Sequence, residues 1–354
     1  MSDLMEIDGS RWSGSGTIVR HAVAMASLLA RPIRIRNIRA RRGNPGLRPQ
    51  HLKAVQACCA LTGGSLENAR VGSSEILYRP GRGIRGGDFR WDIGTAGSTT
   101  MMALCLLPVS LFASGPSRHV ITGGLFQDFA PNAFHLQHVL CPLLARFGIR
   151  AAVRVEKPGY VPSGGGVLEL TVERGIRLKP LRLIDPGAVT KGRGIALASH
   201  LREGRVAERM REAFLKAVAG KGWDPDIRIV EDTSAEQQGA AFAVWAVTQG
   251  GCLIGADRAG KRGRSSEEIG RHVARCLLED LGSGAAVDRF AADQLILFAA
   301  LADGVSEYRV PRITDHIEAN RRLVERMLGA ETAAQGNLLR VRGVRLPGRV
   351  STPG

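Results

Sequence analysis

The chain has 354 residues and carries 49 Lys and Arg side chains against 33 Asp and Glu, a formal net charge of +16 at pH 7. Such an excess of positive charge attracts polyanions, nucleic acid first among them, although it says nothing about the fold. The most apolar run, residues 101–113, is too short to span a bilayer and is interrupted by Pro108 and Ser110, which excludes a membrane span. The opening MSDLMEIDGS is acidic where a signal peptide is basic and apolar, and the six cysteines lack CxxC or Cys/His ligand spacing. Together these features predict a reduced, cytoplasmic protein without a membrane partner.

The first segment of the chain predicts a βαβαββ unit. A strand at 4–8 runs into a Gly/Ser loop, and a helix at 17–30 follows with apolar residues on one face. Ile33, Ile35 and Ile38 alternate with arginines, which is the pattern of a half-buried strand. The remaining elements of the unit are a helix at 50–61 and strands at 75–78 and 89–93.

The same order of elements returns twice. The αβαββ part of the pattern is repeated by helix 98–113, strand 119–122, helix 131–147 and strands 151–155 and 167–172. A weaker third copy contains helix 288–302, strand 307–310, helix 316–328 and a strand around 338–341. A fixed order of elements without obvious sequence identity indicates a structural repeat.

The stretch between the second and third copies does not follow this order, and its two helices are expected at 206–218 and 266–281. We therefore predict an α/β (α+β) fold, in which a large domain of three βαβαββ units carries a smaller inserted α/β domain. The expected limits are 1–182 for repeats one and two, 183–282 for the insert, 283–345 for repeat three and 346–354 for a frayed tail.

The loop at 9–17 and the segment after it are candidates for binding phosphate. Glycines between a strand and a helix let backbone N–H groups approach an anion, yet this loop has neither P-loop nor dinucleotide spacing. From Gly9 to Leu66 there is no Asp or Glu, whereas six arginines lie within 31–42. Arginine binds phosphate bidentately, so this segment predicts a polyphosphate or nucleic-acid surface. A basic face that contacts only solvent is the alternative.

Two of the eight histidines stand out by their position. His51 opens a helix just after the Arg-rich loop, and His316 begins a helix after Thr314 and Asp315. A ring nitrogen at either place could face a cleft, but for a lone histidine the residues by themselves favour a structural role.

Taken together, these segments resemble the RNA 3′-terminal phosphate cyclase family over nearly the whole chain. The matching stretches are Ile7-Asp8-Gly9 with the Gly/Ser loop and Arg20, Ile38–Arg42, Asn44–Leu47, Gln50–Leu52, Arg85–Asp88, Gly94–Ser98, Gly115–Arg118, Gly159–Gly166, Ala292–Leu295, and His316 before Asn320.

The resemblance implies that ATP and a divalent metal, Mg or Mn, convert an RNA 3′-phosphate into a 2′,3′-cyclic phosphate. It makes His316 the nucleophile that receives AMP and passes it to the RNA, and neutral imidazole suits that task near pH 7. The implied RNA and phosphate contacts are Arg20, Arg39, Arg42, Gln50 and His51. The implied ATP-binding residues are Phe290, Ala291, Ala292, Asp293, Gln294 and Leu104. The partner is an RNA with a 3′-phosphate end; the oligomeric state is left open, a homodimer being one option.

This sequence departs from the family pattern at the position of the expected metal ligand. Ser13 stands where a Glu is usual, so the metal ligands stay unassigned. Leu104 replaces a Gln, and Phe290 replaces a Tyr. These departures keep a second hypothesis open, in which the same fold is a non-catalytic RNA-binding, RNA-processing or ribosome-assembly factor. A third, a small-molecule transferase of the fold that includes enolpyruvyl transferases, would leave Asp293 and His316 unexplained.

Overall fold

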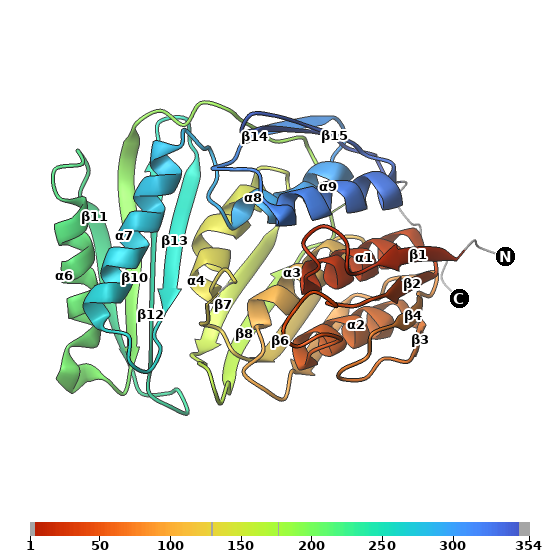
Figure 1. The fold of residues 1–354 in the computed structure, drawn as a ribbon, viewed down its shortest axis with the longest axis horizontal. Coiled ribbons are helices and arrows are strands. Elements are labelled where there is room, and N and C mark those ends of the chain that lie inside the picture. The colour runs from red at the N-terminus through yellow and green to blue at the C-terminus, as the bar shows by residue number, and fades with distance from the viewer. Residues whose placement is uncertain (1–3, 129, 176, 347–354) are drawn as a thin grey trace.

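The computed structural model describes residues 4–128, 130–175 and 177–346. Within these residues the strands form four sheets of four strands each. Figure 1 shows one sheet with two covering helices at one end of the molecule and the N-terminal helices and strands at the other. No helix in the described part of the chain is long and apolar enough to cross a bilayer.

The first unit runs along the chain as βαβαββ. Its elements are β1 (Met5–Asp8), α1 (Gly16–Leu29), β2 (Ile33–Arg36), α2 (Pro49–Thr62), β3 (Ser65–Glu67) and β4 (Ile76–Arg79). The strands are ordered β1-β2-β4-β3, and only the β1–β2 pair is parallel. Ile33 and Ile35 of β2 face the core while Arg34 and Arg36 do not, as the alternation predicted.

The second unit has the same topology. Its elements are β5 (Gly87–Asp92), α3 (Thr99–Ser110), β6 (Ser117–Gly123), α4 (Ala133–His135), the π-helical turn η1 (Leu136–Leu140), α5 (Cys141–Ala145), β7 (Ala151–Lys157) and β8 (Gly166–Val172). The strand order β5-β6-β8-β7, with only β5–β6 parallel, matches that of the first unit.

The third unit repeats this topology but is interrupted in the sequence. Its elements are β9 (Arg182–Leu183), α8 (Ala291–Leu301), β14 (Val305–Arg309), α9 (Asp315–Leu328), β15 (Glu331–Gln335) and β16 (Leu338–Arg342). The order β9-β14-β16-β15 again has a single parallel pair, β9 with β14. All the remaining elements lie between β9 and α8.

The inserted elements make a sheet with helices packed on it and a core of its own. They are β10 (Val189–Ser199), the 3-10 turn η2 (Arg202–Gly204), α6 (Val206–Val218), β11 (Pro225–Asp232), β12 (Gly239–Thr248), β13 (Leu253–Ala259) and α7 (Ser266–Gly282). The strand order is β11-β10-β12-β13. Met210, Phe214 and Phe242 are among the residues of this core, which is separate from the core shared by the three units.

The predicted fold class is confirmed, with corrections at several strands. The strand expected at 89–93 as the end of the first unit is β5, which opens the second unit. The short strands β3, β9 and β15 were not predicted, and the helix expected at 131–147 is divided among α4, η1 and α5. The domain limits stay a prediction, and residues 347–354 of the predicted tail lie outside the described residues.

Helices from all three units pack together around α1. Almost every residue of α1 is buried, and it contacts α2, α3 and α9, while α8 packs against α9 and α3. Alanines at positions 22, 24 and 26 allow this close approach on several sides. Figure 1 shows α1, α8 and α9 in the same region of the molecule.

Candidate active site

A cavity of about 590 Å³ opens where several of these helices begin. The residues from helix starts that line it are Ser15, Gly16 and Thr17 at α1, Gln50 and His51 at α2, Ser98 at α3, Phe290, Asp293 and Gln294 at α8, and Thr314 and His316 at α9. The N-terminus of a helix carries a partial positive charge and unpaired N–H groups, so this convergence favours an anionic ligand.

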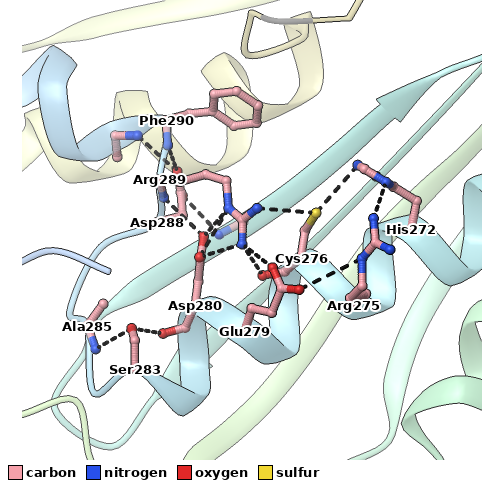
Figure 2. A network of polar contacts seen from close by, with 12 residues as sticks. His272, Arg275, Cys276, Glu279, Asp280, Ser283, Ala285, Asp288, Arg289 and Phe290 are labelled. Carbon is pink, nitrogen blue, oxygen red and sulfur yellow. Dashed lines mark hydrogen bonds and ion pairs between the residues drawn. The ribbon is translucent and has the colours of Figure 1, made fainter. Parts of the chain in front are cut away.

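Five arginines add full positive charge to this cavity: Arg20, Arg39, Arg42, Arg289 and Arg312. Arg289 is neutralised by Asp280 and Glu279, as Figure 2 shows. The other four have no ion pair within the described ranges. The two carboxylates of the lining are engaged elsewhere, because Asp128 pairs with arginines of the insert and Asp293 accepts a hydrogen bond from its neighbour Gln294.

Arg20 is the most buried of these cations. Its side chain is 2% exposed, and its guanidinium donates to the carbonyl of Met101 at 3.4 Å and to Oγ1 of Thr17 at 3.3 Å. Burial lowers the pKa of Arg20, and Asp293 opposes that shift. A buried guanidinium with two neutral acceptors gains from an anion placed beside it.

Arg39 and Arg42 approach the cavity from the loop after β2. Arg39 has a left-handed backbone, φ 52°, and its guanidinium donates to the carbonyls of Asn44 and Gly46. Arg42 donates to the carbonyl of Ser13 at 3.3 Å, which holds the Gly/Ser loop against this segment. Burial and the neighbouring Arg48 and Arg42 lower the pKa of Arg39.

His316 lies in the first turn of α9, which Thr314 caps by accepting the N–H of Ile317 at 3.3 Å. Its Nδ1 is 3.3 Å from Oγ1 of Thr17, and the side chain is half-buried on the cavity wall. One turn further along α9, Asn320 donates to the carbonyl of Asp293 at 2.9 Å and bonds Nδ1 of His21 at 2.8 Å. This network fixes α9 against α8 and α1, and with them the position of His316.

Asp293 and His21 both interact electrostatically with His316. Burial raises the pKa of Asp293, against the lowering effect of His316, Gln294 and Arg20. Burial, Arg20 and His316 lower the pKa of His21 to about 3, so His21 is neutral at pH 7. Because Asn320 uses its amide N–H groups on Asp293, its oxygen accepts from Nδ1–H of His21.

His51 is a neutral donor held over the start of α1. The backbone N–H of Arg48 donates to Nδ1 of His51 at 3.3 Å, which leaves the proton of the neutral ring on Nε2. Burial, together with Arg39, Arg20 and Arg48, lowers the pKa of His51 to about 3. Its neighbour Gln50 accepts the N–H of Ser98 at 2.7 Å and so ties α2 to α3.

Phe290 separates this cavity from a smaller one of about 160 Å³. In Figure 2 its ring points away from the network of polar contacts that holds its backbone. Asp288 accepts the N–H groups of Phe290 and Ala291 at 2.8 and 2.9 Å, and Asp280 accepts from Arg289. These hydrogen bonds hold the backbone of Phe290 in place and so restrict where its ring can lie.

The structure brings most of the predicted site residues to one cavity. They are Arg20, Arg39, Arg42, Gln50, His51, Phe290, Asp293, Gln294 and His316. Leu104, Ala291 and Ala292 do not line it: all three are buried in the hydrophobic core, and Leu104 is 2% exposed. A nucleotide in this cavity has no direct route to the side chain of Leu104.

Sequence reasoning missed several residues of the lining, among them Thr17, Gln127, Asp128, Arg289 and Arg312. Arg289 precedes Phe290 directly, and Arg312 lies four residues before His316, so basic residues beside the matched motifs were a usable signal. Thr17 ends the loop that the sequence marked as a phosphate-binding candidate, but its contact with His316 carried no signal, because that partner is 299 residues away in the sequence.

The described residues of this cavity do not form a preformed metal site. Across residues 4–128, 130–175 and 177–346, no three His, Cys, Asp or Glu side chains gather closely enough to hold a metal ion. Ser13, at the position of the expected ligand, does not line the cavity and shares a hydrogen bond of 3.0 Å with Ser15. The side chains present do not fit a protein-bound divalent cation, which prefers carboxylates.

Comparison with known proteins gives a consistent result. Residues 12–334 match the family model described as RNA 3′-terminal phosphate cyclase. The chain is 36% identical over 347 residues to the RNA 3′-terminal phosphate cyclase of Pyrobaculum neutrophilum, covering 97% of this chain and 99% of that protein. It is 38% identical over 352 residues to the protein of the same name from Thermococcus onnurineus, covering 99% of both chains.

Among solved structures, the enolpyruvyl transferase NikO from Streptomyces tendae matches with 13% identity and a TM-score of 0.27, over 99% of this chain and 84% of that one. A TM-score this low carries no argument about fold or function.

Proposed function

Because this chain belongs to the RNA 3′-terminal phosphate cyclase family, we propose that it uses ATP to convert an RNA 3′-phosphate into a 2′,3′-cyclic phosphate through a histidine–AMP intermediate on His316. The observation that carries the proposal is the placement of His316 in a cavity where buried Arg20 has no carboxylate partner. A nucleophile beside a buried guanidinium that has no ion pair is suited to attack on a phosphate.

The proposed reaction has three displacements at phosphorus. A ring nitrogen of His316 attacks the α-phosphorus of ATP, and the bond to pyrophosphate breaks. An oxygen of the RNA 3′-phosphate then attacks the same phosphorus, which breaks the P–N bond and frees the imidazole. Finally the neighbouring 2′-hydroxyl loses its proton and attacks the RNA phosphorus, and AMP leaves with the bonding electron pair. The second step turns a poor leaving group, oxide, into a good one, AMP.

The arginines and helix starts supply electrostatic stabilisation for these displacements. Arg20 lies beside the start of α1 and contacts the same threonine as His316, so it is positioned to bind the α-phosphate. Arg39 and Arg42 project from the adjoining loop and are suited to the remaining phosphates or to the RNA end. Donors fixed before the reaction begins stabilise developing charge without reorganisation.

We propose that His51 acts as a hydrogen-bond donor and not as a general base. Its Nε2–H faces the start of α1, and its low pKa keeps the ring neutral across the physiological range. A neutral N–H donor can bind a phosphate oxygen at any pH at which the enzyme works. Phe290 and Pro131, which also line the cavity, offer apolar surface to a nucleotide base.

The resemblance implies a divalent metal, but the described side chains do not present a site for one, and no step here is routed through it. Catalysis by this chain's own residues therefore consists of holding the triphosphate and the RNA end in line.

Covalent labelling tests the proposal. The enzyme is incubated with ATP labelled at the α-phosphate and a divalent metal, then separated by denaturing electrophoresis. We expect acid-labile label on the wild type and on His200→Ala, whose exposed histidine lies outside the cavity, and none on His316→Ala. Label that persists in His316→Ala would refute the assignment.

A product assay completes the test. RNA with a labelled 5′ end and a 3′-phosphate should become resistant to phosphomonoesterase, because a cyclic phosphodiester is not its substrate. An unlabelled wild-type protein that still binds this RNA would instead favour the non-catalytic alternative.

A further inference from the structure

Among the described residues, Thr17 is the one whose side chain is within hydrogen-bond distance of both His316 and Arg20. It lies in the first turn of α1, 5% exposed, and its N–H is held by the capping hydroxyl of Ser15. Its Oγ1 is 3.3 Å from Nδ1 of His316 and 3.3 Å from the guanidinium of Arg20. A β-branched side chain in a helix has few accessible rotamers, so this oxygen is well fixed.

The hydrogen-bonding capacities of the three groups limit what Thr17 can do. A guanidinium only donates, so Arg20 occupies one lone pair of the hydroxyl oxygen. One lone pair and one O–H remain for His316. The hydroxyl can therefore accept from a protonated Nδ1 and, after rotation, donate to an unprotonated Nδ1.

We propose that Thr17 is a positioning residue that selects Nε2 of His316 as the attacking nitrogen. The inference rests on the proposed function, because it assumes that His316 receives AMP. When the Thr17 hydroxyl accepts a hydrogen bond from Nδ1–H of His316, the lone pair of the neutral ring lies on Nε2. Because Nδ1 is engaged by Thr17, Nε2 is the ring nitrogen left free to react in the cavity that His316 lines.

The hydroxyl also suits the changes that follow the attack. When Nε2 bonds to phosphorus and pyrophosphate leaves, the ring becomes a cation with its proton on Nδ1. Loss of that proton to solvent gives the neutral phosphoramidate, and the Thr17 hydroxyl then donates to the free Nδ1. Reprotonation of Nδ1 makes the imidazole a better leaving group for transfer of AMP to RNA. A carbonyl, which only accepts, or an ammonium, which only donates, could support only one of the two states at this place.

Other charged groups also face His316 and set the background for any pH dependence. Asp293 on α8 and His21 on α1, which is neutral at pH 7, interact electrostatically with His316, and Arg20 on α1 shares its Thr17 partner; Asp315 and Glu318 lie in the same first turn of α9. None of the hydrogen bonds within the described residues joins these groups to Nδ1, so Thr17 is the direct partner of that nitrogen.

The test compares Thr17→Val, which keeps the shape and removes the hydroxyl, with Thr17→Ser, which keeps the hydroxyl. Single-turnover labelling with α-labelled ATP should be at least roughly tenfold slower in Thr17→Val at saturating ATP, with a smaller change in apparent ATP affinity. Thr17→Ser should stay within about threefold of the wild type. Equal rates in Thr17→Val and the wild type would overturn the inference.

A second readout does not depend on activity. Histidine ring ¹⁵N resonances, assigned to His316 by their loss in His316→Ala, should report the Nδ1–H tautomer in the wild type and in Thr17→Ser. In Thr17→Val the Nε2–H tautomer should gain population. An Nε2–H ring in the wild type would refute the positioning role even if Thr17→Val proved unstable. Failure of the wild type to label at all would instead count against the proposed function.

Discussion

Addition of one methyl group at Gly16 should disable the site. A Cβ atom on residue 16 would collide with Nε2 of His51 and would lie 2.7 and 2.8 Å from Cδ2 and Cε1 of the same ring. Carbon atoms normally approach to about 3.5–4.0 Å, so the ring or the start of α1 must move. The ring cannot swing freely, because it is 6% exposed and Nδ1 is held by the N–H of Arg48.

Two opposing effects set the magnitude for Gly16→Ala. Overpacking costs about 1–3 kcal/mol, whereas alanine favours a helix over glycine by about 0.5–1 kcal/mol. The steric cost is therefore at least as large as the gain, and we expect a net destabilisation of up to about 2.5 kcal/mol in urea unfolding. Loss of the His51 donor from a charged phosphate costs about 1.5–3 kcal/mol more in the reaction, or about 10- to 100-fold in the labelling rate.

A double-mutant cycle identifies the cause. In Gly16→Ala/His51→Ala the clash is gone, so the two substitutions should be less destabilising together than the sum of their separate effects. The double variant should remain slow in labelling, because the donor is still missing. Additive stabilities, or a Gly16→Ala enzyme with wild-type stability and rate, would refute this account of the contact.

Three further predictions follow from the same surroundings. Arg39→Ala and Arg42→Ala should weaken binding of 3′-phosphorylated RNA and reduce the slope of log affinity against log salt by about 0.7 per lost phosphate contact. Arg36 is paired with Glu6 and Glu75, so Arg36→Ala should leave the slope unchanged. Equal slopes in all three variants would show that the arginines of the loop contact solvent and not RNA. The pKa of His21 is about 3 in the folded protein and near 6.5 in the unfolded chain, so the unfolded chain binds the proton more tightly. The contribution of His21 to stability is therefore fully present above pH 6.5 and is lost as pH falls toward 3. His21→Gln, which keeps a donor for Asn320, should flatten the fall in unfolding free energy between pH 6 and 4, and an unchanged pH profile would contradict the shift. Ser13→Glu should lower the metal concentration that half-saturates labelling, because it adds a carboxylate ligand of the kind that the present side chains do not supply. Identical titrations would show that a carboxylate in this loop does not reach the metal.

The sequence predicts best those elements whose side chains divide cleanly between core and solvent. The helix expected at 206–218 coincides with α6, and the one at 266–281 differs from α7 by one residue, because both are amphipathic. The strands β3 and β15 expose most of their side chains and β9 has only two residues, so neither alternation nor an apolar run marked them. Tertiary pairing, rather than local preference, makes them strands.

Prediction of the candidate site was limited in a different way. His316, Asp293 and Arg20 were named from a family resemblance, and their neighbours in the sequence were reachable from the same motifs. Thr17 was not, because hydroxyl side chains at helix starts usually serve as caps. Only the packing of α1 against α9 shows that this hydroxyl faces a histidine on another unit.

The interruption of the third unit affects how the protein folds. Leu183 of β9 pairs with Tyr308 of β14, and everything between β9 and α8 is looped out of that pair. A disordered loop of that length would make the pairing entropically expensive, whereas a folded insert holds its two ends in place and shortens the effective loop. The stability of the insert's own core therefore helps determine how often α9 is docked on α1. Substitutions in the core of the insert, such as Phe242→Ala, should slow the docking of α9 on α1 during folding, although Phe242 does not line the cavity.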